Sequence, residues 1–437
     1  MEVTIEKLIY GGDGLAHHEG ATVFVPFVLP AERVSAEPVE QKKKFVRAQL
    51  TRVLEASPGR IEPRCPHFGT CGGCNYQHVP YERQFAYKAD ILRETLRRIG
   101  RIEWTGDIAT HASPEWAYRN RAQWKVRPIR ARNADAAPGD SIDDAKLAIG
   151  YFRANSTALC AVEDCAILAP SLLTALLSLR ASLAAGTLPR GLREIEAFTS
   201  EEADGSNARL LITATFAGFP SRAAELAETF RKIMPGLEST VFHDPGRDRM
   251  ELFGPGFLDY NVGDAKYRVG HFSFFQVNRF LCAELMREAV ERDPGGRLAL
   301  DLFAGVGLFS VPLAAKFARV VAVESNPAAT RDLEVNARGN AAIEIRTTDV
   351  ARFLERYKES PQLVVLDPPR AGMMPGMVEL LAKVGAARIT YVSCEPPTLA
   401  RDLAALREAG YEITGVHLFD LFPQTFHMET VVHLQRK

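Results

Sequence analysis

The sequence reads Leu298-Ala-Leu-Asp301-Leu-Phe303-Ala-Gly305-Val-Gly307 at the point where an apolar strand enters a glycine-rich turn. Glycines at such a turn allow the backbone to approach a ligand closely beside the N-terminus of a helix, which we expect from about Leu308. The next predicted strand ends at Glu324, 19 residues after Gly305, where a carboxylate can accept hydrogen bonds from both hydroxyls of a ribose. The turn therefore predicts a site for a nucleoside-containing cofactor.

Further residues favour S-adenosylmethionine over a dinucleotide at this turn. Ser310 occupies the position at which a dinucleotide-binding turn has its third glycine. Asp301, directly before the turn, suits the cationic amino group of an amino acid moiety better than a pyrophosphate. Asp349 follows the next strand, where it could contact the adenine or simply cap a helix, and the sequence leaves both interpretations open.

Predicted strands alternate with predicted helices from about residue 271 to residue 437. The strand-like runs are Leu298–Phe303, Val320–Glu324, Ile343–Thr347, Leu363–Asp367 and Ile389–Ser393. This rhythm is typical of a doubly wound α/β sheet, in which ligands bind at the carboxyl ends of the strands. We therefore predict a Rossmann-like catalytic domain over residues 271–437.

Residues 1–270 are predicted to form two further domains. Residues 1–57 contain short strand-like runs joined by turns such as Gly11-Gly-Asp-Gly14, a pattern typical of a small β-barrel of the oligonucleotide-binding class. Residues 58–270 combine a helix at about Tyr81–Ile99, a polar loop at residues 133–144, and mixed strands and helices. The predicted fold class is α/β, with an N-terminal barrel and a central α+β domain.

Basic residues are concentrated near the N-terminus of a chain whose net charge is −1. Residues 1–130 hold 20 lysines and arginines against 15 aspartates and glutamates, and Lys42-Lys-Lys-Phe45-Val-Arg47 sets an aromatic ring among cations. Cations suit the phosphates of RNA, and aromatic rings stack on its bases. The alternative is a charged edge strand that resists aggregation. The predicted barrel favours RNA.

Three segments with reactive side chains fall where an α/β sheet has its active site. Asp367-Pro-Pro-Arg370 and Ser393-Cys394-Glu395 each follow an apolar strand, and Phe422-Pro-Gln-Thr-Phe426-His-Met-Glu429 leads into the last strand. Taken alone, a cysteine at a strand end is more often a small packed apolar residue than a nucleophile. Together, the three segments favour a catalytic site.

Three of the seven cysteines cluster as Cys65-x5-Cys71-x2-Cys74, a spacing unlike that of a disulfide-rich secreted protein. In a reducing cytoplasm this pattern indicates zinc or an iron–sulfur cluster, and the spacing alone does not choose between them. The N-terminus has no signal-peptide pattern, and no apolar run approaches the roughly 18 residues of a membrane span. We therefore expect a cytoplasmic protein that does not enter a membrane.

Taken together, these motifs resemble the RNA uridine-5-methyltransferases of the TrmA/RlmD type over essentially the whole chain. The segments that match in the family's order are Phe275-Gln276-Val-Asn278, Asp301-x-Phe303-x-Gly-x-Gly307, Asp367-Pro-Pro-Arg370, Ser393-Cys394 and His427-x-Glu429. The N-terminal barrel resembles the TRAM domain of the family. The three clustered cysteines, together with Cys165 in Val162-Glu-Asp-Cys165, resemble its 4Fe–4S ligand set.

The resemblance implies a role for each matching residue. Cys394 would be the nucleophile and Glu429 the base. The residues expected to contact S-adenosylmethionine are Gln276, Phe303, Glu324 and Asp367, with Asp349 as a further candidate at a position that is often Asn. The residues expected to hold the 4Fe–4S cluster are Cys65, Cys71, Cys74 and Cys165. Two departures could alter the fit of the substrate, because Glu395 follows the nucleophile where Asn is usual, and Phe426 replaces a glycine.

The implied chemistry needs one thiol and one base. Carbon 5 of uracil becomes nucleophilic once a thiolate adds to carbon 6, and after methyl transfer a base must remove the carbon 5 proton so that the thiol can leave. The target base must also leave its stack. A barrel together with four cysteines resembles the ribosomal enzymes more than the transfer RNA enzymes, so the expected substrate is 23S rRNA, with tRNA as the alternative and no obligate protein partner.

Two other functions are weaker interpretations of the same residues. A non-catalytic RNA-binding protein with a degenerate methyltransferase fold would not need the intact Cys394, Glu429 and cofactor turn. Methylation of an exocyclic nitrogen normally uses a Pro-Pro motif that ends in an aromatic residue, and this chain has Arg370 at that position.

Overall fold

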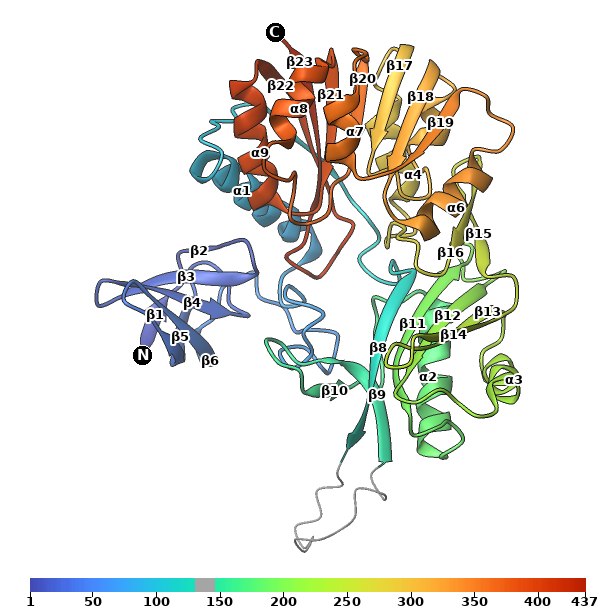
Figure 1. Cartoon of the computed structure of the whole chain (residues 1–437). Coiled ribbons are helices and arrows are strands. Elements are labelled where there is room, and N and C mark those ends of the chain that lie inside the picture. The colour runs from blue at the N-terminus through green and yellow to red at the C-terminus, as the bar shows by residue number, and fades with distance from the viewer. Residues whose placement is uncertain (130–145) are drawn as a thin grey trace, which may run out of the picture. The chain divides into compact units, whose positions relative to one another are not determined.

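The computed structural model describes residues 1–129 and 146–437, and the polar loop expected at residues 133–144 lies outside them (Figure 1). Contacts within the chain divide it into two compact units. The first unit contains residues 1–69, 74–115 and 281–437, and the second contains residues 70–73 and 116–280. The domain boundaries after residues 57 and 270 stay predictions.

The larger sheet of the first unit has the strand order β19-β18-β17-β20-β21-β23-β22-β7. Its strands are β17 (Gly296–Leu302), β18 (Phe317–Glu324), β19 (Ile343–Thr347), β20 (Leu363–Leu366), β21 (Arg388–Ser393), β22 (Tyr411–Phe419), β23 (Glu429–Arg436) and β7 (Ile108–His111). Strands β17 to β21 pair in parallel, and β23 runs antiparallel between β21 and β22. This topology confirms the predicted Rossmann-like α/β fold. The edge strand β7, from a distant part of the chain, was not predicted.

Helices cover the sheet because its central strands are apolar on both faces, as parallel strands usually are. The helices of the first unit are α1 (Tyr81–Arg98), α4 (Cys282–Val290), α5 (Ser310–Leu313), α6 (Pro327–Asn336), α7 (Val350–Arg356), α8 (Met377–Val384) and α9 (Pro396–Glu408). One continuous core joins the strands to apolar residues of α1, α7, α8 and α9, among them Leu92, Leu354, Leu381 and Leu403. The helix expected at Tyr81–Ile99, which is α1, therefore packs against the larger sheet.

Two predicted strands end one residue too late. β17 ends at Leu302 and β20 at Leu366, so Phe303 and Asp367 lie in the turns that follow. Phe303 has a φ of 64°, which a regular strand does not tolerate. Both side chains are thereby moved out of the sheet and into the edge where ligands bind. The helix after the turn begins at Ser310, later than the predicted start at about Leu308, and it ends at Leu313.

A second sheet of the first unit has the strand order β1-β5-β6-β4-β3-β2 and encloses a core of its own. Its strands are β1 (Glu2–Thr4), β2 (Lys7–Leu8), β3 (Asp13–His18), β4 (Ala21–Pro26), β5 (Arg33–Gln41) and β6 (Phe45–Glu55). This sheet is the β-rich N-terminal part that was predicted. Leu8 and Leu29 leave its core and join that of the larger sheet, so the two sheets share apolar contacts.

The turn predicted at Gly11-Gly-Asp-Gly14 is only half correct. Gly11 and Gly12 form the turn, with φ angles of 106° and 90°, but Asp13 and Gly14 begin β3. A Cβ atom at Gly14 would collide with the side chains of Ile5 and Val28. Here glycine permits close packing inside a strand rather than a turn.

The second unit is an α+β structure, as predicted. Its main sheet has the strand order β10-β9-β8-β11-β12-β13-β14. The elements of this unit are β8 (Arg121–Ile129), β9 (Lys146–Phe152), β10 (Leu159–Ala161), α2 (Pro170–Ala184), β11 (Leu192–Ser200), β12 (Arg209–Phe216), α3 (Ala223–Ile233), β13 (Leu237–Asp244), β14 (Arg249–Phe253), and the hairpin of β15 (Phe257–Val262) and β16 (Ala265–Gly270).

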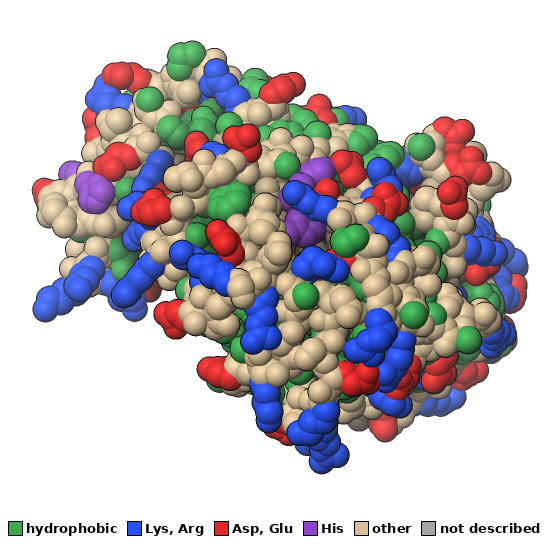
Figure 2. Space-filling view, turned by 90° about the horizontal axis from the view of Figure 1, so that it is seen from above, with side chains coloured by type: hydrophobic (Ala, Val, Ile, Leu, Met, Phe, Trp, Pro, Cys, Tyr) green, Lys and Arg blue, Asp and Glu red, His purple; other side chains and the backbone are tan. Residues whose placement is uncertain are grey.

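Charged side chains of both signs are interspersed on the face of the molecule shown in Figure 2. This mixture agrees with a chain in which 53 basic residues are nearly balanced by 54 acidic ones. Among the described residues, every helix is too short or too polar to span a membrane.

Candidate active site

The glycine-rich turn after β17 has the backbone conformation that its sequence predicts. Phe303, Gly305 and Gly307 all have positive φ angles, of 64°, 55° and 91°. A Cβ atom at Gly307 would collide with Leu333 of α6, so glycine is required for the turn to pack against this helix. The Ala304 N–H donates to the carbonyl of Val323 at 3.0 Å, which ties the turn to the end of β18.

Glu324 ends β18 beside this turn, and the backbone fixes its carboxylate. One carboxylate oxygen accepts a hydrogen bond from the N–H of Gly305 at 2.8 Å. The other accepts from the N–H groups of Ser325 and Asn326 at 2.7 and 2.6 Å. A carboxylate held in this way needs little reorganisation to receive a ligand. Its predicted contact with a ribose stays a prediction.

Asp301 lies buried beneath the turn and accepts a hydrogen bond of 2.5 Å from the hydroxyl of Ser310. Burial raises the pKa of Asp301 to about 7; the Ser310 hydrogen bond opposes this shift and the charge of Glu324 adds to it. Ser310, which the sequence analysis noted only as a residue in place of a third glycine, therefore connects α5 to the carboxyl end of β17.

Asp349 is the N-cap of α7. Its side chain accepts a hydrogen bond from the N–H of Arg352 at 3.1 Å, which satisfies one of the free donors at the start of the helix. The capping interpretation of this residue is thus confirmed, whereas its contact with an adenine stays a prediction.

Cys394 and Glu429 are brought together by strand pairing. In the antiparallel ladder of β21 and β23, Ser393 lies opposite Thr430. Cys394 comes directly after Ser393, and Glu429 directly before Thr430, so the two residues continue the ladder at the edge where the parallel strands end. Asp367 reaches the same edge from β20, because Leu366 pairs with Tyr391 of β21. The three predicted residues therefore form one site.

The charges in this site act on one another. Burial raises the pKa of Cys394 to about 12, and the carboxylates of Glu429 and Asp367 add to the shift. Burial and the charge of Asp367 raise the pKa of Glu429 well above its usual value. Burial also raises the pKa of Asp367 to about 7, with a contribution from Asp301. A thiol among carboxylates holds its proton tightly, so forming the thiolate requires a nearby cation or base.

Arg370 brings a positive charge to this site, a role that sequence reasoning did not assign to it. It lowers the pKa of Cys394 through its charge and through a hydrogen bond to the thiol, and its charge also opposes the shift of Glu429. Its place in Asp367-Pro-Pro-Arg370, after the strand next to that of Cys394, is the signal that could have revealed this role.

Replacing Arg370 by alanine should raise the pKa of Cys394 further and reduce activity at neutral pH. Each unit of increase in this pKa lowers the thiolate fraction about tenfold. The limb of the pH–rate profile that reports the thiol should move to higher pH, and Arg370→Lys should restore part of the rate. An Arg370→Ala enzyme with an unchanged pH profile of kcat/KM would exclude this role.

The segment that carries Glu429 into the site is anchored by α1. The Lys88 ammonium donates to Asp420 at 2.7 Å and to the carbonyl of Phe422 at 3.2 Å, and both ionised side chains are fully buried. Gln84 exchanges two hydrogen bonds with Gln424, at 3.0 and 2.9 Å. A lysine on the buried face of a helix was the available sequence signal, and it was missed.

Glu395 and Phe426, the two departures from the family pattern, both contact Tyr10, which lies in the loop after β2. The Tyr10 hydroxyl donates to Glu395 at 2.9 Å, and the Tyr10 ring meets that of Phe426 edge-on, with centroids 5.4 Å apart. Burial raises the pKa of Tyr10, and Glu395 adds to this shift. Tyr10 thus supports both Glu395, beside Cys394, and the segment that leads to Glu429.

The remaining predicted residues are divided between the two units. Gln276 belongs to the second unit, where its carbonyl accepts a hydrogen bond from Asn120 at 3.0 Å. All seven cysteines lie in the described residues, and none of them forms a disulfide bond. Cys65 and Cys74 belong to the first unit, and Cys71 and Cys165 to the second. These last two thiols lie close to the same phenol, since both raise the pKa of Tyr151, whose main cause is burial.

Known proteins resemble the chain over its whole length. A family model described as tRNA (Uracil-5-)-methyltransferase matches residues 257–437. An RNA methyltransferase of Aquifex aeolicus, itself named as uncharacterized, is 32% identical, and the match covers 100% of this chain and 99% of the relative. The 23S rRNA (uracil(1939)-C(5))-methyltransferase RlmD of Klebsiella pneumoniae (strain 342) is 34% identical over 100% of this chain and 96% of the relative.

A solved structure agrees in fold. It is the tRNA (uracil-54, C5)-methyltransferase of Pyrococcus abyssi in complex with S-adenosyl-L-homocysteine, which is 24% identical, covers 99% of this chain and 100% of its own, and has a TM-score of 0.73. With relatives above 30% identity over the full length and a thiol, a carboxylate and a cofactor turn at one sheet edge, this chain belongs to the RNA uracil-5-methyltransferase family.

Proposed function

We propose that this chain transfers a methyl group from S-adenosylmethionine to carbon 5 of a uridine in 23S rRNA. The observation that carries the proposal is the alignment of Cys394 with Glu429 at the ends of β21 and β23, with Asp367 beside them. A methyltransferase that acts on nitrogen or oxygen has no need for a nucleophilic thiol, whereas methylation at carbon 5 of uracil requires one.

Each residue of the site has a distinct part in this reaction. Cys394 adds to carbon 6 of the uracil ring, and Arg370 stabilises the thiolate before it attacks. Carbon 5 then takes the methyl group, after which Glu429 accepts the carbon 5 proton and Cys394 leaves. A carboxylate whose pKa lies well above its usual value is a stronger base than an exposed glutamate, and so it is better suited to this proton transfer.

The acidic residues around the turn fit S-adenosylmethionine by charge. The donor carries a sulfonium and an ammonium, and it supplies the methyl group. Asp301 and Asp367, whose ionisation is hindered by burial, gain stability as carboxylates when a cation lies beside them. Glu324 offers fixed acceptors for the ribose, and Phe303, Gln276 and Asp349 complete the proposed contact set.

The choice of ribosomal RNA is tested by comparing substrates directly. Full-length protein is incubated with methyl-labelled S-adenosylmethionine and either 23S rRNA or total tRNA, both isolated from a strain that lacks this gene. We expect 5-methyluridine in 23S rRNA only, as identified by mass spectrometry of nuclease digests. Labelling confined to tRNA would overturn the choice of substrate, and a product other than 5-methyluridine would overturn the reaction.

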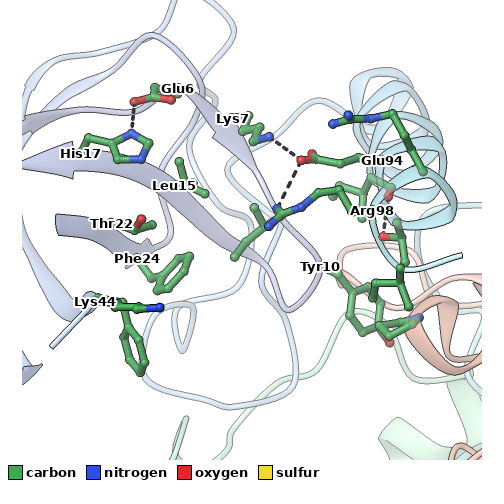
Figure 3. A pocket seen from close by; sticks show the side chains of 17 residues that line it. Glu6, Lys7, Tyr10, Leu15, His17, Thr22, Phe24, Lys44, Glu94 and Arg98 are labelled. Atoms are coloured by element: carbon green, nitrogen blue, oxygen red, sulfur yellow. Dashed lines mark hydrogen bonds and ion pairs between the residues drawn. The ribbon is translucent and has the colours of Figure 1, made fainter. Parts of the chain in front are cut away.

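A groove of about 760 Å³ between the N-terminal sheet and α1 supports an RNA partner. Figure 3 shows Phe24 and Lys44 on the sheet side of the groove, facing Glu94 and Arg98 on the helix. Lys7 spans the two sides through its ion pair of 2.5 Å with Glu94. Tyr10 also lines the groove, so this surface continues to Glu395 and the catalytic segment. We propose that the N-terminal sheet is a TRAM domain and that single-stranded RNA follows this groove.

Replacing Lys42–Lys44 together by alanine should weaken RNA binding and flatten its salt dependence. The three side chains are exposed, and each lost phosphate contact should reduce the slope of log K against log salt by about 0.7 for single-stranded RNA. Removing residues 1–57 would be a poorer test, since it would uncover the core that contains Leu8 and Leu29. Alanine at the exposed Lys232, Lys358 and Lys437 removes the same charge elsewhere and is the control. Equal slopes for both triple variants would contradict the proposal.

We further propose that Cys65, Cys71, Cys74 and Cys165 hold a 4Fe–4S cluster. Four cysteines outside any disulfide form a donor set that suits such a cluster, and Cys71 and Cys165 lie near the same phenol within one unit. The purified protein should be brown under anaerobic conditions and contain iron and sulfide, and Cys165→Ser should lose the colour. Cys282→Ala should keep it, since that thiol is buried and its pKa is raised to about 12. Stoichiometric zinc without iron or sulfide would contradict a cluster.

A further inference from the structure

Three histidines gather on one face of the larger sheet, away from the residues assigned above. His111 ends β7, His417 lies in β22 and His433 lies in β23. His417 pairs with Ala109 and with Val431, and side chains two residues apart along a strand point to the same face. The strand register therefore turns all three imidazoles the same way. Their side chains are 15%, 11% and 11% exposed.

Helix α4 brings two carboxylates to this face. Glu284 and Glu288 are four residues apart and so lie on the same side of the helix. Glu284 contacts Nδ1 of His111 at 2.6 Å. One oxygen of Glu288 lies 3.2 Å from Nε2 of His417 and 3.0 Å from Nε2 of His433.

The hydrogen bonds fix the tautomers of two of the rings. Arg292 lies 2.8 Å from Nε2 of His417, and a guanidinium can only donate, so this nitrogen carries a lone pair. The Nδ1 of His417 then carries the proton and donates to Nε2 of His111 at 3.1 Å. The remaining nitrogen of His111 donates to Glu284. Nε2 of His417 thus accepts from Arg292, and Nε2 of His111 accepts from His417, so each carries a lone pair that a metal ion could take in place of the hydrogen bond it accepts here.

This arrangement matches a transition-metal site. One donor atom each from His111, Glu288 and His417 can be chosen so that all three lie within 4.8 Å of one another. A tetrahedral ion with bonds of about 2.0–2.1 Å holds its ligand atoms about 3.3 Å apart, close to the 3.2 Å between His417 and Glu288. The hydrogen bond from His111 to Glu284 is the outer carboxylate contact that metal-bound histidines usually make.

We propose that His111, Glu288 and His417 bind a divalent transition-metal ion such as Zn²⁺, Co²⁺ or Ni²⁺. In the structure described here, the guanidinium of Arg292 provides the positive charge, since it also lies 3.4 Å from Glu288. Its side chain is 52% exposed, so it can turn outward when the ion enters. The ion would join β7 and α4 to the C-terminal hairpin of β22 and β23, and it would stabilise the first unit without entering the methylation chemistry.

Titration of the full-length protein with Co²⁺ alone tests this site. Imidazole and carboxylate ligands give visible ligand-field bands without the intense near-ultraviolet sulfur-to-metal band that the cysteines would give, so the two kinds of ligand are distinguishable. We expect one Co²⁺ ion with the bands of imidazole and carboxylate ligands, and a higher Tm of the protein in its presence. His417→Gln should bind at least tenfold more weakly, whereas Arg292→Ala should bind more tightly because the competing cation is gone.

The control is His17→Ala, which removes a histidine that contacts Glu6 at 2.6 Å but is part of no such cluster among the described residues. It should bind Co²⁺ as the unaltered protein does. The proposal is overturned if only sulfur-to-metal bands appear in both the unaltered protein and Arg292→Ala. It is equally overturned if a folded His417→Gln protein, with an unchanged Tm in the absence of metal, binds Co²⁺ with undiminished affinity.

Discussion

Replacing Cys394 by alanine should abolish methylation of RNA, with a loss of at least about 10⁴-fold, while S-adenosylmethionine still binds. The reason is chemical, because without a nucleophile at carbon 6, carbon 5 of uracil never becomes reactive toward the methyl donor. The fold should tolerate the change, since Cys394 lies beyond the last pair of β21 and is only partly buried. Turnover with labelled donor and calorimetric titration of S-adenosylmethionine measure the two effects separately.

Cys394→Ser is the matched variant for this experiment. It keeps a side chain of similar size but replaces the thiol with a much weaker nucleophile, so it should be as inactive as alanine and equally able to bind the donor. Activity within tenfold of the unaltered enzyme in either variant would show that another group adds to carbon 6.

Replacing Glu429 by glutamine should stop the reaction after methyl transfer instead of before it. The thiol can still add and the methyl group can still move, but the carbon 5 proton then has no base to accept it. General base catalysis contributes about 10²–10⁴-fold, and the lost turnover should appear as a covalent complex of protein and RNA. A denaturing gel with methyl-labelled donor should show the label on a band that contains both.

The double variant Cys394→Ala with Glu429→Gln is the control, since it should form no labelled band. Glu429 is buried beside Asp367, and burial and the charge of Asp367 both disfavour its ionised form. Glutamine is neutral and has nearly the same shape as glutamate, so the variant should fold. A folded Glu429→Gln enzyme that accumulates no labelled complex would show that another group removes the proton.

The local patterns of the sequence predicted most of the catalytic sheet. The alternation of apolar strands and helices placed β17, β18, β20 and β21 within a few residues, because a parallel strand buried on both faces has to be continuously apolar. It also predicted the bounds of the edge strand β19, which is only partly buried. The same patterns placed Asp367 and Cys394 after neighbouring strands. Pairing of Ser393 with Thr430, which sets Glu429 beside Cys394, depends on an antiparallel register that no local pattern contains.

Contacts between distant segments explain what was missed. Lys88 and Asp420 are 332 residues apart, and neither gives a motif by itself. Tyr10 and Glu395 are 385 residues apart. The cluster of His111, Glu288 and His417 comes from three distant segments, β7, α4 and β22, that only the tertiary fold brings together. Sequence patterns placed distant residues in one site only where those residues followed predicted strands or matched the motifs of the family.

The order in which the chain is synthesised gives the anchoring of α1 a further consequence. Unit one contains residues 1–115, apart from 70–73, together with 281–437, so its two halves leave the ribosome on either side of the whole of residues 116–280. At about 5–20 residues per second, α1 waits tens of seconds for Asp420 and the strands that cover Leu92. During that time, Lys88 keeps α1 from being fully apolar on the face that will be buried. We expect residues 116–280 to fold first, and the nascent N-terminal part to be the species that chaperones hold.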